Sequence, residues 1–384
     1  MTQRLNAQMA FLCEADCLKS IDRQNVLQDH SRPENSAEHS WHAALFALIL
    51  DYPTVKSDAQ RDEIISLILI HDLVEIDAGD HPIHLEHNHA AIAEAESEAA
   101  DRLFGLLPDT QSKLMRASWS SFENAETEVA KTAKLIDYFQ PMIQASAPSN
   151  ARPDQTDVVR ENLRSGRAKN FPDVWPEAYS QVTSLLDGCD RPETRMGQQL
   201  DFLIEADRLK SIYRATRLHN NSRFENSAEH SWHIALYALI LSEYAPLGCD
   251  ITRVIRMLLI HDIVEIDAGD APIHGDFDAD EMHKKELAAA DRLFGLLPQD
   301  QAKELRNLWD EFEAIQTPDA KFAKALDRMP SPLANIANGG GSWTEYDVTL
   351  DHLDKRVGIP IERGAPELWQ WLRPVIQNWY REQT

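Results

Sequence analysis

The sequence predicts an all-α protein made of two tandem helical bundles related by internal duplication. Glycine accounts for only 14 of the 384 residues, about 4 % against a usual ~7 %, which disfavours turn-rich β architectures. The longest apolar stretches have the length of helices and lack the alternation of half-buried strands. Four sequence blocks occur twice in the same order, so we expect the same fold twice in one chain.

The duplicated blocks are nearly identical and evenly spaced. Their second copies follow by 191 residues for the first two blocks and by 190 for the last two, so one residue has been lost in between. The blocks occupy residues 11–23 and 202–214, 34–42 and 225–233, 70–84 and 260–274, and 101–108 and 291–298. A polar seam with Gly and Pro lies at 185–198. We therefore expect two domains, repeat one at 1–188 and repeat two at 189–384.

The composition excludes several classes of partner and location. Lys plus Arg number 38 and Asp plus Glu number 63, a net charge of −25, and an acidic surface of this kind repels nucleic acids and anionic membranes. Four cysteines without a CxxC pair indicate reduced thiols rather than a disulfide scaffold. No apolar window approaches ~18 residues, and no signal-like apolar run begins the chain. A soluble, cytoplasmic protein is expected.

The helices of repeat one can be followed in order along the chain. Asn35 and Glu38 have the spacing of a capping box, which predicts the start of a helix with an apolar face. Residues 62–76 are almost wholly apolar and predict a buried helix; their isoleucine content leaves a buried strand as the alternative, but their length favours a helix. Repeat two has the same order, and no strand is predicted in either repeat. Further helices are expected at 90–104, at 109–125 and at 126–140, the last ending before Pro141.

A dense group of ionisable residues follows the apolar run of each repeat. His71 and Asp72 end this run in repeat one, where an ionised carboxylate is costly unless it pairs with a cation. Glu75 lies one helical turn further on the same face, and Asp77 and Asp80 follow. A divalent cation is the simplest source of the positive charge that such a group needs. The second copy comprises His261, Asp262, Glu265, Asp267 and Asp270.

One further histidine and one further aspartate complete the pattern in each repeat. His39 and His230 lie in the Asn-capped helices, and Asp137 and Asp327 each follow the His-Asp pair by the same interval. A buried histidine taken alone is more often a core residue than a ligand. Two histidines and two aspartates from three helices, present in both repeats, predict a mixed nitrogen and oxygen metal site with room for water.

The ordered motifs resemble the HD-domain metal-dependent phosphohydrolases, and among them the 5′-deoxynucleotidase branch. The resemblance rests on ENSAEHS, on HDLVEIDAGDHP and HDIVEIDAGDAP, and on the later aspartate, and it covers nearly the whole chain twice. It implies two tandem HD domains that hydrolyse phosphomonoesters, with (deoxy)nucleoside 5′-monophosphates as substrates. It also implies one divalent metal ion per repeat, whose identity among Mn²⁺, Co²⁺, Fe²⁺, Ni²⁺, Mg²⁺ and Zn²⁺ stays open.

The resemblance also assigns roles to residues of this chain. The family's metal ligands fall on His39, His71, Asp72, Asp137, His230, His261, Asp262 and Asp327. Its catalytic acidic pair falls on Glu75 and Asp80 and on Glu265 and Asp270, and its phosphate-binding arginine falls on Arg23 and Arg214. The alternatives are helix caps and surface ion pairs. His42 and His233, one turn after the ligand histidines, either support the ligands or merely pack.

Other functions stay open at this stage. A phosphodiesterase or nucleotide pyrophosphohydrolase with two metals would need extra histidines between the His-Asp pair and the last aspartate, and only His84 and His274 recur there. A nucleotide-binding regulatory module would have lost an acidic residue in at least one repeat, and neither repeat has. The expected partner is a small phosphorylated substrate. The tandem is expected to form a pseudo-dimer within one chain, with further oligomerisation open.

The two repeats differ after the last aspartate. Repeat one continues as DYFQPMIQAS and repeat two as DRMPSPLANI, so that only repeat two carries the arginine usual in the family, Arg328. Repeat one also has no counterpart of Lys284 and Lys285. These differences predict that both repeats bind metal and that repeat two is the more conventional enzyme.

Overall fold

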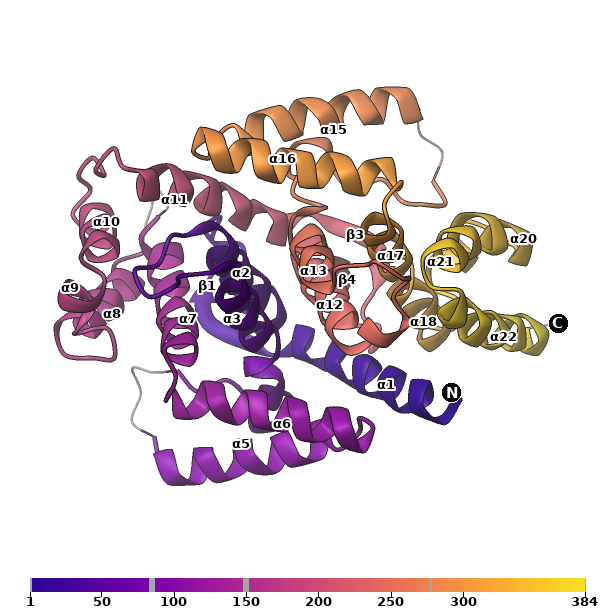
Figure 1. Ribbon diagram of the computed structural model, residues 1–384, viewed down its shortest axis with the longest axis horizontal. Coiled ribbons are helices and arrows are strands. Elements are labelled where there is room, and N and C mark those ends of the chain that lie inside the picture. The colour runs from indigo at the N-terminus through magenta and orange to yellow at the C-terminus, as the bar shows by residue number, and fades with distance from the viewer. Residues whose placement is uncertain (1, 83–86, 148–151, 276–277, 384) are drawn as a thin grey trace.

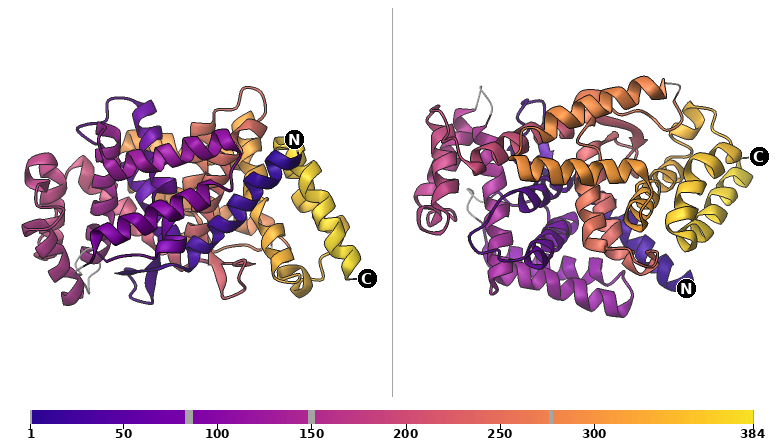
Figure 2. Two further views of the ribbon diagram at one scale, coloured as in Figure 1. Left: turned by 90° about the horizontal axis from the view of Figure 1, so that it is seen from below. Right: turned by 45° about the horizontal axis from the view of Figure 1, so that its top comes forward.

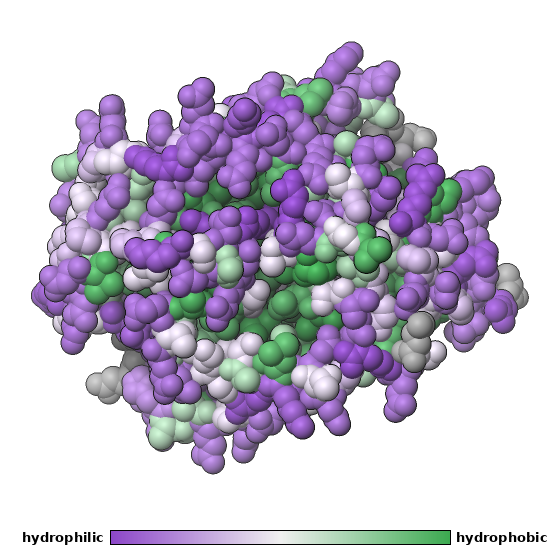
Figure 3. Space-filling view, in the orientation of Figure 1, coloured by the Kyte–Doolittle hydropathy of each residue, from purple (hydrophilic) through white to green (hydrophobic). Residues whose placement is uncertain are grey.

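The computed structural model describes residues 2–82, 87–147, 152–275 and 278–383, and these are largely helical. Figure 1 shows repeat one, in indigo to magenta, beside repeat two, in rose through orange to yellow. The predicted all-α class is confirmed. None of the described helices is long and apolar enough to span a membrane. Hydrophilic residues cover most of the face drawn in Figure 3, and hydrophobic ones gather towards its middle.

Repeat one begins with a helix, a tight turn and a two-stranded ribbon, and the rest is helical. Its ribbon consists of β1 (Asp22–Val26) and β2 (Pro33–Asn35), and its 3-10 turns are η1 (Asp16–Ser20) and η2 (His71–Val74). Its helices are α1 (Thr2–Ala15), α2 (Ser36–Ile49), α3 (Asp58–Ile70), α4 (Glu75–Ala78), α5 (His89–Phe104), α6 (Asp109–Asn124), α7 (Glu128–Ser146), α8 (Pro153–Arg164), α9 (Phe171–Val174) and α10 (Pro176–Leu186).

Repeat two follows a similar order, and after the helix that carries the later aspartate it has five α-helices where repeat one has three within the described residues. Its ribbon consists of β3 (Tyr213–Arg217) and β4 (Phe224–Asn226), and its tight turns are η3 (Asp207–Ser211), η4 (Ser242–Tyr244) and the π-helical η5 (Asp354–Gly358). Its helices are α11 (Arg195–Ala206), α12 (Ser227–Ile240), α13 (Ile251–Ile260), α14 (Glu265–Ala268), α15 (Ala279–Phe294), α16 (Gln299–Ala314), α17 (Pro318–Asp327), α18 (Pro330–Ala337), α19 (Ser342–Glu345), α20 (Leu350–Leu353), α21 (Ile359–Gly364) and α22 (Pro366–Glu382). The domain bounds at 1–188 and 189–384 stay a prediction.

The predicted capping box is present at the start of α2 and again at the start of α12. The Asn35 side chain accepts a hydrogen bond from the Glu38 amide at 3.0 Å, and the Glu38 carboxylate accepts one from the Asn35 amide at 2.8 Å. Asn226 and Glu229 repeat this exchange. The reciprocal bonds satisfy amides that have no partner inside the helix, so each helix starts at a fixed residue and its first histidine has a fixed place.

The apolar helix predicted at 62–76 is interrupted at the His-Asp pair. α3 ends at Ile70, the 3-10 turn η2 holds residues 71–74, and α4 resumes at Glu75. A 3-10 turn advances three residues per turn rather than 3.6, so it reorients His71 and Asp72 relative to α3. A turn at 261–264 breaks the helix of repeat two at the equivalent place.

The predicted end of a helix before Pro141 is wrong. α7 continues through Pro141 to Ser146, because Met142 and Ile143, which follow the proline, are buried in the core and their packing offsets the backbone hydrogen bond lost at proline, about 3 kcal/mol. In repeat two the chain does break, since α17 ends at Asp327 and Pro330 begins α18.

The two small ribbons were not predicted from the sequence. Each is antiparallel, and each pairs a five-residue strand with a three-residue one. Residues 22–26 read DRQNV and lack the apolar alternation that marks a half-buried strand. The ribbons matter for the site because β1 carries Arg23 and β3 carries Arg214.

The two repeats meet through α2 and α12 at the centre of the molecule, and their first helices cross over (Figures 1 and 2). α1 of repeat one packs on α12, and α11 of repeat two packs on α2. The Trp41 indole donates to the Leu259 carbonyl at 3.0 Å, and Trp232 donates to the Leu69 carbonyl at 3.0 Å. Such reciprocal contacts are those of a two-fold interface in a homodimer, here within one chain.

Candidate functional site

The four predicted ligands of repeat one come together beneath the ribbon. His39 is on α2, His71 and Asp72 are in η2, and Asp137 is on α7. The His39 Nε2 atom lies 3.1 Å from Asp137 Oδ1, and the His71 Nε2 atom lies 3.0 Å from Asp72 Oδ1 and 3.5 Å from Asp137 Oδ1. Three helical segments thus direct two ring nitrogens and two carboxylates towards one point.

Repeat two brings its quartet together in the same way. The His230 Nε2 atom lies 3.2 Å from Asp327 Oδ1, and the His261 Nε2 atom lies 2.9 Å from Asp262 Oδ1. In both repeats the ligand atoms of the two histidines and the later aspartate lie within 4.8 Å of one another. The eight predicted ligands therefore form two separate groups of four.

The protonation of the second histidine fits a metal ligand. His71 Nδ1 lies 2.7 Å from the Ile68 carbonyl, and His261 Nδ1 lies 2.9 Å from the Leu258 carbonyl. Because a carbonyl only accepts, Nδ1 carries the proton, and in the neutral imidazole Nε2 therefore keeps its lone pair. Both Nε2 atoms are buried and have no hydrogen-bond donor among the described residues. Imidazole nitrogens and carboxylates together suit a first-row divalent cation, so the residues present fit such an ion.

The predicted acidic pair lies beside the quartet. Ser36 Oγ donates to Glu75 Oε2 at 2.5 Å, and Asp80 Oδ1 is 3.9 Å from the Arg23 guanidinium. Burial, with the neighbouring Asp72 carboxylate, raises the pKa of Glu75 to about 8, and burial also raises the pKa of Asp80. In repeat two, Ser227 Oγ donates to Glu265 Oε2 at 2.6 Å, and burial raises the pKa of Glu265 and of Asp270. Glu75 can therefore hold a proton near neutral pH, and the pKa values of the other three carboxyl groups are shifted in the same direction.

The two predicted phosphate-binding arginines reach the same place from the ribbons. Arg23 Nη1 lies 2.9 Å from Asp72 Oδ2 and 3.6 Å from Glu75 Oε1. Arg214 Nη1 lies 3.0 Å from Asp262 Oδ2. Neither is a surface ion pair, since the Arg23 side chain is 15 % exposed and that of Arg214 is 12 % exposed. Each presents a guanidinium to the cavity that contains the quartet.

A cavity opens over each quartet, and the two cavities have different walls. That of repeat one measures about 560 Å³ and that of repeat two about 510 Å³. Tyr138 and Arg167 line the first cavity, with Tyr138 directly after the ligand Asp137. Arg328 and Arg356 line the second, where Arg328 Nη1 lies 3.2 Å from Asp327 Oδ2, while Lys134 and its counterpart Lys324 line the two cavities alike. The second cavity therefore holds more positive charge next to its quartet.

Several other residues that the sequence singled out lie apart from the quartets. Asp77 pairs with Arg102 and Asp267 with Arg292 in exposed ion pairs, and the two aspartates lie in the short helices α4 and α14. His274 lines the cavity of repeat two, whereas His84 lies outside the described residues. His42 and His233 are buried at the contact between the repeats.

The sequence did not reveal the residues that contact the Nδ1 atom of His39 and of His230, on the side of the ring away from the quartet. Glu34 and Glu225 lie next to the Nδ1 atoms of His39 and His230, and Lys210 and Lys19 bind these glutamates from the opposite repeat. A signal was present, because both the lysine of the KSI segment and the glutamate of ENSAEHS recur in the two copies.

Known proteins support the relation suggested by the motifs. The HD domain model matches residues 15–179 and again residues 206–369. The 5'-deoxynucleotidase HDDC2 of Homo sapiens is 33 % identical over 130 residues, which are 34 % of this chain and 62 % of the human protein. The 5'-deoxynucleotidase hdd1 of Schizosaccharomyces pombe is 28 % identical over 188 residues, 47 % of this chain and 89 % of that protein. The match thus spans less than two thirds of the length of the human protein.

A solved structure is also similar. It is a predicted metal-dependent phosphohydrolase from Magnetospirillum magnetotacticum MS-1, with 49 % identity and a TM-score of 0.47, covering 49 % of this chain and 97 % of that one. The two matches of the family model together cover most of this chain, one in each repeat. This chain therefore belongs to the HD domain family, and it contains the domain twice.

Proposed function

We propose that this protein is a metal-dependent phosphohydrolase that converts (deoxy)nucleoside 5′-monophosphates to nucleoside and phosphate, with one divalent ion in each of the domains 1–188 and 189–384. The observation that carries the proposal is the buried Nε2 atom of His71 and of His261, which has no hydrogen-bond donor in the part of the chain that the structure describes, lies beside the carboxylate of Asp72 or Asp262 and converges with the later aspartate. His39, His71, Asp72 and Asp137 would hold the ion in repeat one. His230, His261, Asp262 and Asp327 would hold it in repeat two.

The ion, when bound, would lower the pKa of a coordinated water and polarise the phosphoryl group. Arg23 and Arg214 supply the planar fork that matches two phosphate oxygens. In the described structure the charge of each guanidinium group is partly neutralised by a ligand aspartate. An ion that takes up this aspartate's charge would leave the guanidinium available to the substrate.

The two carboxyl groups of each site divide the proton transfers between them. Glu75 lies closer to the quartet and keeps its proton to an unusually high pH because of burial and Asp72. Asp80 Oδ1 lies 3.9 Å from the same Arg23 nitrogen that is 3.6 Å from Glu75 Oε1. We assign the water-facing role to Glu75 and Glu265, because a raised pKa makes a carboxylate a stronger base once it has lost its proton, and protonation of the leaving 5′-oxygen to Asp80 and Asp270, whose raised pKa favours the acid form.

The site fits a phosphomonoester better than it fits the phosphodiester or the pyrophosphate substrates of the alternative enzymes. Within the described residues, each cavity offers one group of two histidines and one aspartate with converging ligand atoms. A two-metal mechanism needs a second set about 4 Å from the first, and none of the described cavity residues supplies it. The phosphodiesterase and pyrophosphohydrolase alternatives are therefore disfavoured.

The test is a phosphate-release screen of the full chain. Deoxynucleoside and nucleoside 5′-monophosphates, 3′-monophosphates, cyclic nucleotides and nucleoside triphosphates are each assayed with Mn²⁺, Co²⁺, Fe²⁺, Ni²⁺, Mg²⁺ and Zn²⁺. We expect release from 5′-monophosphates and none from the chelated protein. The double variant His71→Ala/His261→Ala is the matched control for contaminating phosphatases. Release from cyclic nucleotides or triphosphates alone would replace the proposal with the corresponding alternative.

A further inference from the structure

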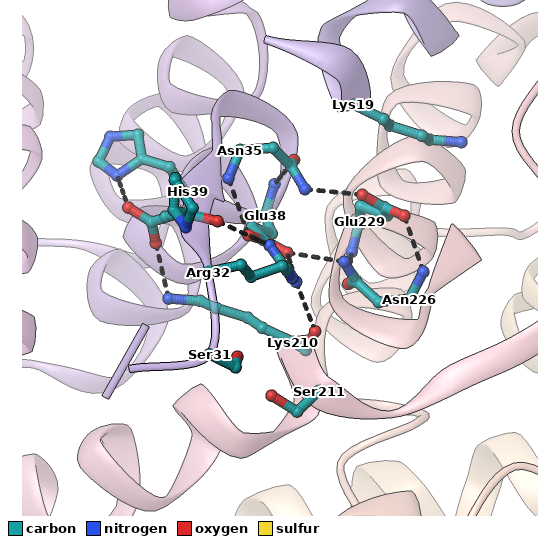
Figure 4. Close-up of polar contacts among 12 residues, drawn as sticks. Lys19, Ser31, Arg32, Asn35, Glu38, His39, Lys210, Ser211, Asn226 and Glu229 are labelled. Atoms are coloured by element: carbon teal, nitrogen blue, oxygen red, sulfur yellow. Dashed lines mark hydrogen bonds and ion pairs between the residues drawn. The ribbon is translucent and has the colours of Figure 1, made fainter. Parts of the chain in front are cut away.

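A buried group of charged residues, contributed by both repeats, lies behind each quartet. Lys210, from η3 of repeat two, is wholly buried. Its Nζ atom lies within 2.9 Å of four acceptors, two of them carboxylates: Glu34 Oε1 at 2.7 Å, Asp207 Oδ1 at 2.5 Å, Gln144 Oε1 at 2.8 Å and His42 Nδ1 at 2.9 Å. Figure 4 shows Lys210 reaching from repeat two to the carboxylate that faces His39.

The same arrangement recurs with the repeats exchanged. Lys19, from η1 of repeat one, lies 2.5 Å from Asp16, 2.7 Å from Glu225 and 2.9 Å from His233. His233 Nε2 donates to the Leu12 carbonyl at 2.8 Å, so its Nδ1 is an acceptor for the lysine. Each lysine thus crosses to the opposite repeat and neutralises a glutamate there.

These groups are not additional metal sites. Asp16, Glu225 and His233 lie close enough to hold a cation, and so do Glu34, His42 and Asp207. The ammonium group of a lysine already occupies the middle of each set at hydrogen-bond distance. It supplies the positive charge that two buried carboxylates need, so a cation there would have to displace it.

Each glutamate turns its second oxygen towards the first ligand of the metal site. Glu225 Oε2 lies 3.3 Å from His230 Nδ1, and Glu34 Oε2 lies 3.6 Å from His39 Nδ1. A carboxylate at this place favours a proton on Nδ1 and a lone pair on Nε2, the atom that points into the quartet. Such partners orient a ligand histidine and raise its basicity.

We propose that each lysine is a positioning residue for the metal site of the other repeat. It acts through a series of three residues, Lys19–Glu225–His230 in one direction and Lys210–Glu34–His39 in the other. The proposal rests on the proposed metal sites. Without its lysine, each glutamate would lose its nearest counterion, which for Glu225 leaves the more distant Arg214 Nε at 3.4 Å, and it would no longer be fixed against the imidazole. Neither repeat then contains a complete site by itself, which gives a physical reason for the two copies to be fused.

The two series differ in how the ligand histidine is held. In repeat one, Gln140 Oε1 lies 2.8 Å from His39 Nδ1 and holds the ring in parallel with Glu34. Proline occupies the equivalent position, Pro330, in repeat two, so Glu225 acts there without that amide. Repeat two should therefore depend more strongly on Lys19 than repeat one depends on Lys210.

The experiment measures metal binding at one site at a time in the full chain. His71→Ala leaves only the site of repeat two, and His261→Ala leaves only that of repeat one. Lys19→Met and Lys210→Met are each placed in both backgrounds, and Co²⁺ is titrated by calorimetry and by its visible absorption. Circular dichroism checks the fold of every variant.

The expected result is crossed. Lys19→Met lowers the Co²⁺ affinity of repeat two by roughly 10- to 100-fold and leaves repeat one within about twofold of its parent. Lys210→Met lowers the affinity of repeat one by a smaller factor and leaves repeat two unchanged. A variant that only loosened the fold would weaken both sites together.

Three outcomes would overturn the proposal: losses confined to the repeat that carries the lysine, equal losses at both sites, or no loss at all. If His71→Ala and His261→Ala bind no Co²⁺ before any lysine is changed, the metal sites themselves are wrong. Should a single lysine variant not fold, Asp16→Asn/Lys19→Met and Asp207→Asn/Lys210→Met remove the ion pair as a unit, and the same crossed pattern is required of them.

Discussion

The two repeats are alike where a metal would bind and unlike where a substrate would lie. Both quartets have the same residues and closely similar distances, such as 3.1 and 3.2 Å between the first histidine and the later aspartate. Directly after that aspartate, Tyr138 in repeat one corresponds to Arg328 in repeat two. Duplication has thus retained the same group of four residues in both copies while the adjoining wall has diverged.

The divergence begins where the helix of the later aspartate ends in one repeat and continues in the other. In repeat two α17 ends at Asp327 and Pro330 begins α18, whereas in repeat one α7 runs on through Pro141 to Ser146. The wall of the first cavity is therefore formed by α7 and α8, and the second is lined by Ser331, Ser342 and Arg356. A change of backbone direction has replaced a whole side of the pocket, so the two sites are expected to differ in substrate preference and not only in rate.

The largest expected difference between the repeats is in phosphate release. Because Arg328 and its neighbours give the second cavity more positive charge, His261→Ala should lower release from 5′-monophosphates by about tenfold or more, the size of loss that damage to a metal site produces. His71→Ala should lower it less than twofold. Initial rates at saturating substrate measure both, and metal analysis should find one ion per chain in each variant. Equal losses would mean that the two cavities are catalytically equivalent.

A smaller effect is expected when only the substrate contact is removed. Arg328→Gln, made in the His71→Ala background, should raise KM for a 5′-monophosphate about tenfold, since a charge-assisted hydrogen bond contributes about 1.5–3 kcal/mol. Co²⁺ affinity separates this from an effect through Asp327, which Arg328 also contacts. Arg373→Gln, which removes an exposed pair with Asp354, is the matched control. Unchanged KM with weakened metal binding would show that Arg328 supports the ligand instead of the substrate.

The sequence was informative wherever a short local pattern determines the structure. The Asn35 capping box and the amphipathic helices were predicted correctly, since they depend on neighbours within a few residues. The quartet residues, picked by charge in apolar surroundings, do lie together. Their roles as ligands stay a prediction, as does the division of work between Glu75 and Asp80.

The features that were missed depend on contacts between distant segments. Lys19 and Lys210 appear in the sequence as ordinary charged residues, and only the crossing of α1 and α11 places them behind the opposite quartet. The end predicted at Pro141 followed the usual effect of proline, which buried packing of Met142 and Ile143 overrides. The ribbons escaped notice because polar strands this short have no periodic signal.

The smallest difference is expected at the contact between the repeats, where the two halves are equivalent. Asn35 donates to Glu229 at 2.8 Å and Asn226 donates to Glu38 at 2.7 Å, and each also caps its own helix. Asn35→Ala and Asn226→Ala should therefore each lower the free energy of unfolding by about 2–3 kcal/mol, the sum of a lost cap and a buried carboxylate left short of a donor.

The two asparagine variants should agree within about 0.5 kcal/mol, the usual tolerance for independent equivalent sites. Denaturant unfolding of the full chain measures them. Thr127→Ala, which removes the cap of α7 with no contact across the repeats, is the control and should cost about 1 kcal/mol. A clear inequality between Asn35→Ala and Asn226→Ala would show that divergence has reached the interface too. Equality would confine it to the cavity walls, where selection on two different substrates would act.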